Sequence, residues 1–125
     1  MFRIDFQDGN IVVFTFAGEF TLDQYFAAMA QLDASEAYNR NIDTIWDLRE
    51  ADTKSLGIED VRSIAANARS LAARRKKDWK VAIVAQTDLT FGLARMYEAY
   101  ASGVHHRTKV FRNFEEAEAW VRKPD

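Results

Sequence analysis

The segment that most constrains the fold is residues 79–86, WKVAIVAQ. Apart from Lys80, its first seven residues are apolar at consecutive positions rather than at every second one. A strand with this pattern has both of its faces buried, because successive side chains point to opposite sides. Such strands are typical of the centre of a parallel sheet that helices cover on both sides. The segment therefore predicts a layered α/β domain.

The N-terminal region predicts a hairpin followed by a helix. Residues 2–6, FRIDF, alternate apolar and charged side chains, which indicates a half-buried strand. The pair Asp8-Gly9 is a tight-turn signal, and residues 11–18, IVVFTFAG, return as a second strand. Thr21 and Gln24 fit a capping box that opens a helix from residue 22 to about residue 33.

Strands and helices alternate along the rest of the chain. We expect strands at 44–48, 79–86 and 108–112, and helices at about 58–74, at 88–102 and after Asn113. The order β-β-α-β-α-β-α-β-α predicts a mainly parallel sheet with one antiparallel edge strand and right-handed crossovers. At 125 residues the chain has the length of a single domain, residues 1–125.

Composition excludes several classes of function. The chain contains no cysteine, which excludes disulfides and thiolate metal sites, and its net charge of -2 argues against a nucleic-acid binder. No apolar run is long enough to span a membrane, and no signal peptide is apparent, so we expect a cytoplasmic protein. The adjacent His105 and His106 cannot converge on one metal ion, and we expect no metal or cofactor. The run RRKK at residues 74–77 is interpreted as a charge-stabilised helix end.

Polar side chains gather where the central strands are predicted to end. Asp47 lies at the C-terminal end of the predicted strand 44–48 and Arg49 just after it, and Gln86 ends the predicted strand 79–86 with Asp88 just after it. Ligands of open α/β sheets bind at this carboxyl edge, so these four residues form a candidate ligand rim. The alternative is that Asp47 only accepts hydrogen bonds from the loop after it. No nucleophile or phosphate-loop motif is present, which makes an enzyme the least favoured class.

The stretch DLREADTKSLGIEDVR, residues 47–62, carries two hydroxyls, Thr53 and Ser55, between a strand and a helix. Serine is a preferred helix N-cap, so Ser55 is predicted to cap the helix that follows. The segment also resembles the central part of STAS domains of the anti-sigma-factor-antagonist type, which reads DLS…DSSGL. The resemblance implies a phosphorylated serine at this place, so Ser55 and Thr53 are candidates for phosphorylation or for the helix cap. Lys54 here replaces an aspartate, and SLG replaces SSG.

The order of elements is similar to that of STAS domains over essentially the whole chain. The segments WDLR, GLARMYEA and VFRNFEEAEAWV resemble the SpoIIAA-like group of small bacterial proteins, also described as STAS/SEC14-like. This resemblance implies a SpoIIAA-like fold and a non-enzymatic regulatory or protein-interaction module. The supply of nine Phe, four Tyr and three Trp favours an alternative, a carrier for a small apolar ligand of lipid-like character.

Two further expectations concern aromatic side chains. Trp46 shares one face of its strand with Leu48, and we expect it to be largely buried. Self-association as a homodimer is predicted through the helix at 88–102, whose stripe of Leu89, Leu93, Met96, Tyr97 and Tyr100 packs on the sheet. Phe91 lies off that stripe, and we interpret Phe91, Met96, Tyr97 and Tyr100 as the candidate interface. The alternative is that Phe91 packs against a neighbouring loop.

Overall fold

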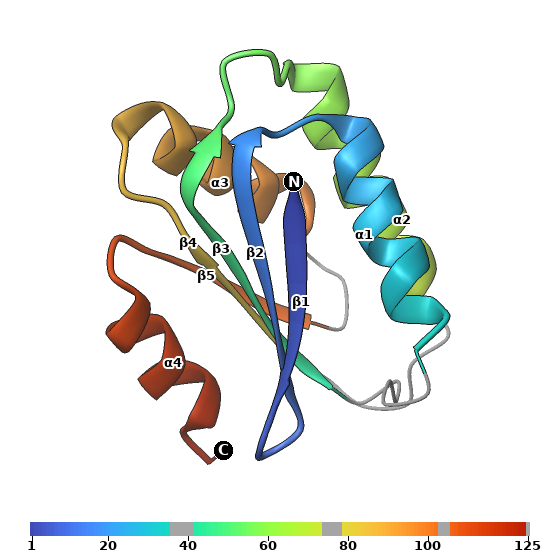
Figure 1. Ribbon diagram of the computed structural model, residues 1–125. Coiled ribbons are helices and arrows are strands. Elements are labelled where there is room, and N and C mark those ends of the chain that lie inside the picture. The colour runs from blue at the N-terminus through green and yellow to red at the C-terminus, as the bar shows by residue number, and fades with distance from the viewer. Residues whose placement is uncertain (36–41, 74–78, 103–105, 125) are drawn as a thin grey trace.

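A computed structural model describes residues 1–35, 42–73, 79–102 and 106–124. Its elements follow the predicted order (Figure 1). They are β1 (Phe2–Gln7), β2 (Ile11–Glu19), α1 (Leu22–Asp33), β3 (Asp43–Asp52), α2 (Ile58–Ala72), β4 (Trp79–Val84), α3 (Asp88–Tyr100), β5 (His106–Phe111) and α4 (Phe114–Arg122). The basic run at 74–77 and His105 lie outside the described residues, whereas His106 begins β5.

The five strands form one sheet in the order β1-β2-β3-β4-β5. β1 and β2 are antiparallel, and the other three pairs of neighbours are parallel. The predicted mixed sheet with one antiparallel edge strand is therefore confirmed. At the β1–β2 turn, Gly9 and Asn10 both have positive φ angles, of 85° and 65°. Gly9 of the Asp8-Gly9 pair adopts its positive φ without steric cost, because glycine has no side chain.

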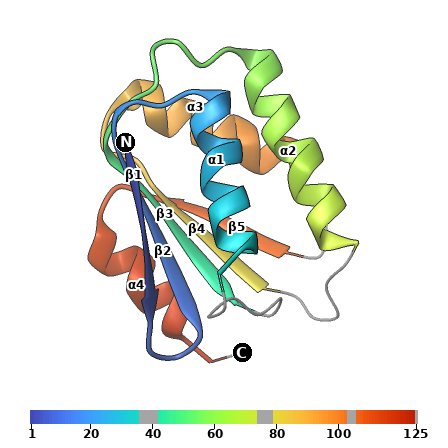
Figure 2. The same ribbon diagram turned by 45° about the vertical axis from the view of Figure 1, so that its right-hand side comes forward.

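Helices cover the two faces of the sheet unequally, as Figures 1 and 2 show. One face is covered by α1, α2 and α3, and Trp46 and Leu48 project from β3 into this layer. The other face is covered by α4, whose Ala117 and Val121 pack on Ile45 of β3. All six residues of β4 are buried between the two layers, as its continuous apolar sequence predicts.

Two of the predicted helix caps are present. The Thr21 side chain accepts a hydrogen bond from the backbone N–H of Gln24 at 3.2 Å and caps α1. Asn113 accepts one from the N–H of Glu116 at 2.8 Å and caps α4. α3 has a further cap that was not among those predicted. The Thr87 hydroxyl accepts a hydrogen bond from the N–H of Thr90 at 3.2 Å. These bonds satisfy N–H groups that have no partner inside a helix.

The buried stripe of α3 is rotated from the predicted one. Leu89 was predicted to pack on the sheet, but its side chain is 51% exposed. The fully buried positions are Thr90 and Ala94, four residues apart, and Leu93 and Tyr97 lie on the same side of the helix. Small side chains at 90 and 94 let the helix approach the sheet closely. The prediction was wrong at Leu89 because it assigned the largest apolar side chains to the buried face. The residues that contact the sheet most closely are the smaller Thr90 and Ala94.

Gly92 offers a test of the exposed side of α3. A methyl group built on Gly92 would meet nothing within 4 Å, and the residue is exposed within the helix. Gly92→Ala is expected to stabilise the protein by about 0.5–1 kcal/mol, because alanine loses less backbone entropy on forming a helix. Urea unfolding would measure the change. Gly9→Ala is the control, and it should destabilise the protein because Gly9 has a positive φ.

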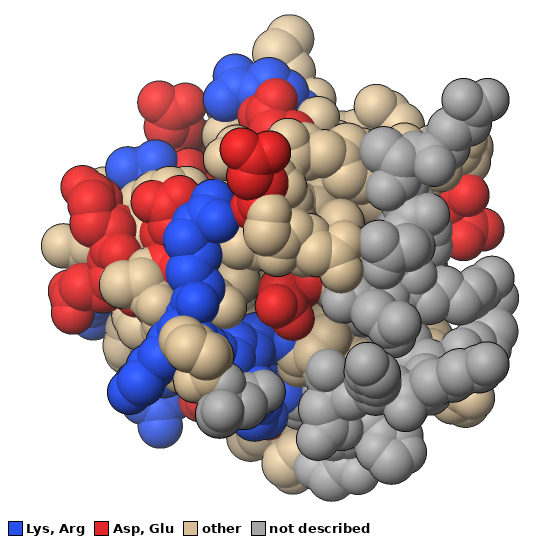
Figure 3. Space-filling view, turned by 90° about the horizontal axis from the view of Figure 1, so that it is seen from below, with Lys and Arg blue, Asp and Glu red and all other residues tan. Residues whose placement is uncertain are grey.

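No helix among the described residues is long and apolar enough to cross a membrane. Figure 3 shows the end of the molecule that carries the β1–β2 turn and the end of α4. On the part of this surface that described residues form, acidic and basic side chains are interspersed.

Candidate functional site

A cavity lies between the sheet and the helices α1, α2 and α3. Its volume is about 100 Å³. Its wall includes Phe14, Trp46 and Leu48 from the sheet, and Ala68, Ala94 and Tyr97 from the helices. Among the described residues that line it, none carries a charged side chain, and its polar groups are the hydroxyls of threonine and tyrosine and the indole N–H groups of Trp46 and Trp79. The space is chemically suited to an uncharged, largely apolar molecule.

Trp46 forms the centre of the cavity wall on the sheet. Its ring stacks on Phe14 with 4.4 Å between centroids and on Tyr25 with 5.4 Å. It also lies parallel to Phe16 at 5.6 Å. Trp46 was expected to be largely buried but is half-buried, because part of its surface borders the cavity instead of another side chain.

Tyr25 and Tyr97 place hydroxyl groups in the helix layer around the cavity. The Tyr25 hydroxyl accepts a hydrogen bond from Asn67 Nδ2 at 2.9 Å. Burial raises the pKa of Tyr25 to about 12, against the smaller lowering effect of that hydrogen bond. Burial also raises the pKa of Tyr97. Both phenols are therefore neutral at physiological pH and act as hydrogen-bonding groups, not as bases.

The Thr53 side chain is buried in the cavity wall and is not exposed on the surface of its loop. It is 3% exposed, and its hydroxyl shares a 2.7 Å hydrogen bond with that of Thr90, which is also buried. Both residues line the cavity. The prediction that Thr53 caps α2 is wrong, because its hydroxyl bonds to Thr90 of α3 and not to the start of α2. Phosphorylation of Thr53 stays a prediction.

Ser55 is not the cap of α2, contrary to the prediction. The N-cap residue is Gly57, and the Asp60 carboxylate accepts from the Gly57 N–H at 2.9 Å. Ser55 lies two residues earlier, is exposed, and donates to the Glu19 carboxylate at 2.7 Å. The chain turns at Lys54 and Ser55, where the Leu56 N–H donates to the Thr53 carbonyl at 3.0 Å, and Ser55 therefore lies before the helix begins. Phosphorylation of Ser55 stays a prediction.

This arrangement predicts opposite outcomes for two alanine variants. Ser55→Ala should change the free energy of unfolding by less than about 0.5 kcal/mol, because it removes one exposed hydrogen bond. Asp60→Ala should cost about 0.5–2 kcal/mol, since it removes the side chain that holds the first turn of α2. Denaturant unfolding of both variants would measure this. A larger loss for Ser55→Ala than for Asp60→Ala would contradict the assignment of the cap.

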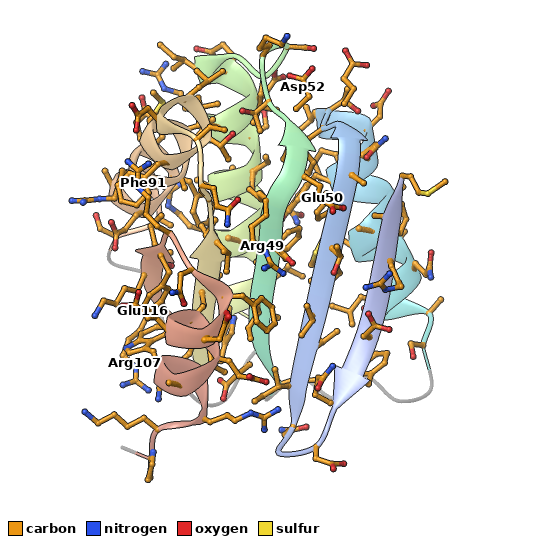
Figure 4. The ribbon with its side chains drawn as sticks, turned by 60° about the vertical axis from the view of Figure 1, so that its left-hand side comes forward. Arg49, Glu50, Asp52, Phe91, Arg107 and Glu116 are labelled. Atoms are coloured by element: carbon orange, nitrogen blue, oxygen red, sulfur yellow. The ribbon has the colours of Figure 1, made fainter. Side chains whose placement is uncertain are left out.

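Asp47 and Arg49 of the predicted rim form an ion pair of 2.8 Å, and Arg49 lies on the face of the sheet that α4 covers (Figure 4). Arg49 donates through Nε to Asp47 Oδ1 at 2.9 Å and through Nη2 to Oδ2 at 2.8 Å. The Arg49 backbone N–H also donates to Oδ1, at 3.2 Å. The register between β2 and β3 shifts just after Asp47, so Leu48 and Arg49 together face one residue of β2, which turns the Arg49 guanidinium toward Phe114.

The Asp47 hydrogen bond raises the pKa of the Arg49 guanidinium. Asp47 is 5% exposed, and its carboxylate is occupied by Arg49. Asp47 accepts from a backbone N–H, as in the alternative considered for it, but the donor Arg49 belongs to β3 itself and not to a loop after the strand, and its guanidinium supplies the other two bonds.

The other two rim residues form a separate group. Arg112 donates to the Gln86 backbone carbonyl at 2.9 Å and lies 3.0 Å from an Asp88 carboxylate oxygen. Its guanidinium also covers the ring of Phe91, with 4.2 Å between the Arg112 Cζ atom and the ring centroid. Phe91 thus packs under the segment that follows β5, which is the alternative considered for it. The four rim residues do not converge on one ligand site.

The candidate interface residues of α3 have different surroundings. Tyr97 lines the cavity, whereas Met96 and Tyr100 are half-buried, and the Arg62 guanidinium lies 5.3 Å from the Tyr100 ring centroid. Participation of α3 in self-association stays a prediction.

Lys80 is a buried cation that the sequence reading treated only as part of a strand. It is 5% exposed, and its Nζ donates to the carbonyls of Trp120 at 2.9 Å and Lys123 at 2.5 Å. These carbonyls end α4, where a positive charge is favourable. Lys80 therefore fixes α4 to the sheet. Within the described residues, no group of three or more His, Cys, Asp or Glu side chains could hold a metal ion.

Comparisons with known proteins support the fold. No family model and no curated protein matches the sequence. Among solved structures, the chain is similar to an uncharacterised protein of the DUF3478 family from Shewanella loihica PV-4, which has a SpoIIAA-like fold. The two chains are 17% identical with a TM-score of 0.59, and the alignment covers 97% of this chain and 92% of the other. The SpoIIAA-like fold implied by the resemblance is confirmed.

Proposed function

We propose that this chain is a non-enzymatic binding module of SpoIIAA-like fold that holds a small apolar ligand between its sheet and α1–α3. The observation that carries the proposal is the cavity of about 100 Å³. Filling apolar space of this volume stabilises a protein by up to about 2 kcal/mol, the value for a fully enclosed core cavity. That is a sizeable part of the stability of a small domain. A cavity lined by Leu, Ile and Phe side chains can bind benzene when its volume is similar.

The lining supports an uncharged ligand. A charged group would lose its hydration without meeting an opposite charge among the described residues of the wall, and this costs several kcal/mol. Aromatic rings of Trp46, Phe14 and Tyr25 supply a flat apolar surface, and the tyrosine and threonine hydroxyls can orient one polar atom of a ligand.

Native mass spectrometry of the protein purified from its own cells tests this proposal, because it reports any retained ligand and the oligomeric state together. Toluene titration, followed by the fluorescence of Trp46 and Trp79 in the cavity wall, tests the cavity directly. Absence of both a retained ligand and a toluene response would contradict the proposal.

A variant that fills the cavity sharpens the test. Ala94 lines the cavity and is 5% exposed, so Ala94→Leu should place its side chain in the empty space. We expect toluene binding to weaken at least about tenfold, and because Ala94 lies where α3 approaches the sheet closely, the larger side chain should also cost about 1–3 kcal/mol of stability. Ala99→Leu is the matched control, since Ala99 is an exposed alanine of the same helix. Equal toluene binding by both variants would show that the ligand binds elsewhere.

A regulatory role of STAS type is the second candidate. It is favoured by the position of Ser55, which is exposed on the β3–α2 connection and bonds to Glu19. A phosphate on Ser55 would place its negative charge beside the Glu19 carboxylate and break this hydrogen bond, which would alter the surface at this edge of the sheet. Phosphopeptide mass spectrometry of cell-derived protein tests it, and an unmodified Ser55 under all growth conditions would contradict it.

A further inference from the structure

The exposed edge of the sheet is β1, the first strand in the order (Figure 4). The backbones of Met1 and Ala17 exchange both hydrogen bonds, at 2.9 and 3.2 Å. In an antiparallel pair such residues recur at every second position, so the N–H and C=O groups of Arg3 and Asp5 also face β2. The backbone groups of the alternate residues, Phe2, Ile4 and Phe6, therefore point away from β2, toward a further strand.

The β1 sequence is complementary to itself when read antiparallel. With Ile4 on a two-fold axis, Ile4 lies opposite Ile4 of a second copy, and Phe2 lies opposite Phe6. On the other face, Arg3 lies opposite the partner's Asp5, and Asp5 lies opposite the partner's Arg3. The residues that pair by hydrogen bonds in this register are Phe2, Ile4 and Phe6, which are the ones whose backbone groups are directed outward.

The side chains on both faces of β1 suit this pairing. Arg3 and Asp5 form an ion pair of 2.8 Å within the strand, and their side chains are 70% and 41% exposed. They are free to turn toward a second copy without loss of core packing. On the opposite face Phe6 is 38% exposed, and Phe26 of the adjacent helix α1 is 42% exposed. Charged side chains on an edge strand ordinarily prevent it from pairing with the edge strand of another chain. Here the two positions that would face each other across the two-fold axis, Arg3 and Asp5, carry opposite charges and would attract.

We propose that β1 pairs with β1 of a second copy of this chain about a two-fold axis at Ile4, so that the two sheets join into one. The interaction is isologous, because each Arg3 meets the partner's Asp5 and the reverse. This surface lies on the opposite edge of the sheet from α3 and does not use the cavity.

Charge exchange at two exposed positions tests the pairing. Arg3→Asp makes both positions acidic, and Asp5→Arg makes both basic, so each homodimer would contain two repulsive pairs in place of two attractive ones. Each variant alone should dimerise about tenfold more weakly than the native chain, measured by sedimentation velocity across a dilution series. An equimolar mixture of the two variants should recover native affinity as a heterodimer, and so should the double variant Arg3→Asp/Asp5→Arg.

Three outcomes would overturn the proposal. The first is a native chain that stays monomeric at roughly tens of micromolar. The second is a dimer whose affinity is the same in all charge variants. The third is a dimer that Phe91→Asp abolishes while Arg3→Asp does not, which would place the interface on α3. Circular dichroism of each variant shows that a lost dimer is not a lost fold.

Discussion

Trp46→Ala is expected to lower the free energy of unfolding by about 3 kcal/mol. This is the lower end of the range for removing a large aromatic side chain from a core. The ring stacks on Phe14 and Tyr25, so its removal takes this stacking contact away from both partners. The loss stays at the lower end because part of the Trp46 surface already faces a cavity.

Phe14→Ala is the comparison for this variant. Phe14 is 0% exposed and lies in the same aromatic cluster, so its loss should reach about 3–5 kcal/mol. Urea unfolding at neutral pH would measure both. A loss below about 1 kcal/mol for Trp46→Ala would show that the ring contributes little to packing, as at surface positions.

Alkaline pH is expected to destabilise the protein through Tyr25. The pKa of this residue is about 12 in the folded chain and about 10 when unfolded, so the folded state binds its proton more tightly. The stabilisation is complete below pH 10 and is lost as pH rises toward 12. A difference of about two pH units corresponds to roughly 2–3 kcal/mol. Stability measured by urea unfolding between pH 8 and 12 should fall steeply above pH 10.

Tyr25→Phe separates this effect from general alkaline denaturation. The variant loses the hydrogen bond from Asn67, so it should be less stable than the native chain at neutral pH. Above pH 10 the difference between the two proteins should shrink, because Tyr97 titrates in both and only the native chain must also ionise the buried phenol of Tyr25. Parallel pH profiles for the two proteins would contradict the assignment.

The fold could be predicted from the sequence because its determinants are local. The continuous apolar run of β4 indicates burial on both faces, and Thr21 and Asn113 mark helix starts by a hydrogen bond to a residue three positions away. The alternation in β1 identifies a half-buried strand. Each of these signals depends on side chains that are neighbours in sequence. The structure contains each predicted element, although β3 (Asp43–Asp52) continues four residues past its predicted end at residue 48.

The candidate site could not be predicted in the same way, because it is made by distant contacts. The Thr53–Thr90 hydrogen bond joins residues 37 positions apart, and the Tyr25–Asn67 bond joins residues 42 positions apart. The cavity depends on how closely three helices approach the sheet, which no periodicity reports. The predicted rim placed Arg49 after a strand that in fact continues to Asp52, and it did not include Arg112, which binds Gln86 and Asp88. The apparent cap at Ser55 failed for a local reason, the turn before Gly57.

The order of strands in the sheet has a consequence for how the chain reaches its native state. Each strand pairs with the strand that precedes or follows it in sequence, so no strand must wait for a distant segment before it can pair. The sheet can grow by one strand at a time as each crossover helix forms. Because loop-closure entropy increases with sequence separation, this topology keeps the barrier to folding low for a largely parallel sheet. The fully buried β4 is completed only when partners have formed on both of its sides, which makes its amides the natural place for slow hydrogen exchange.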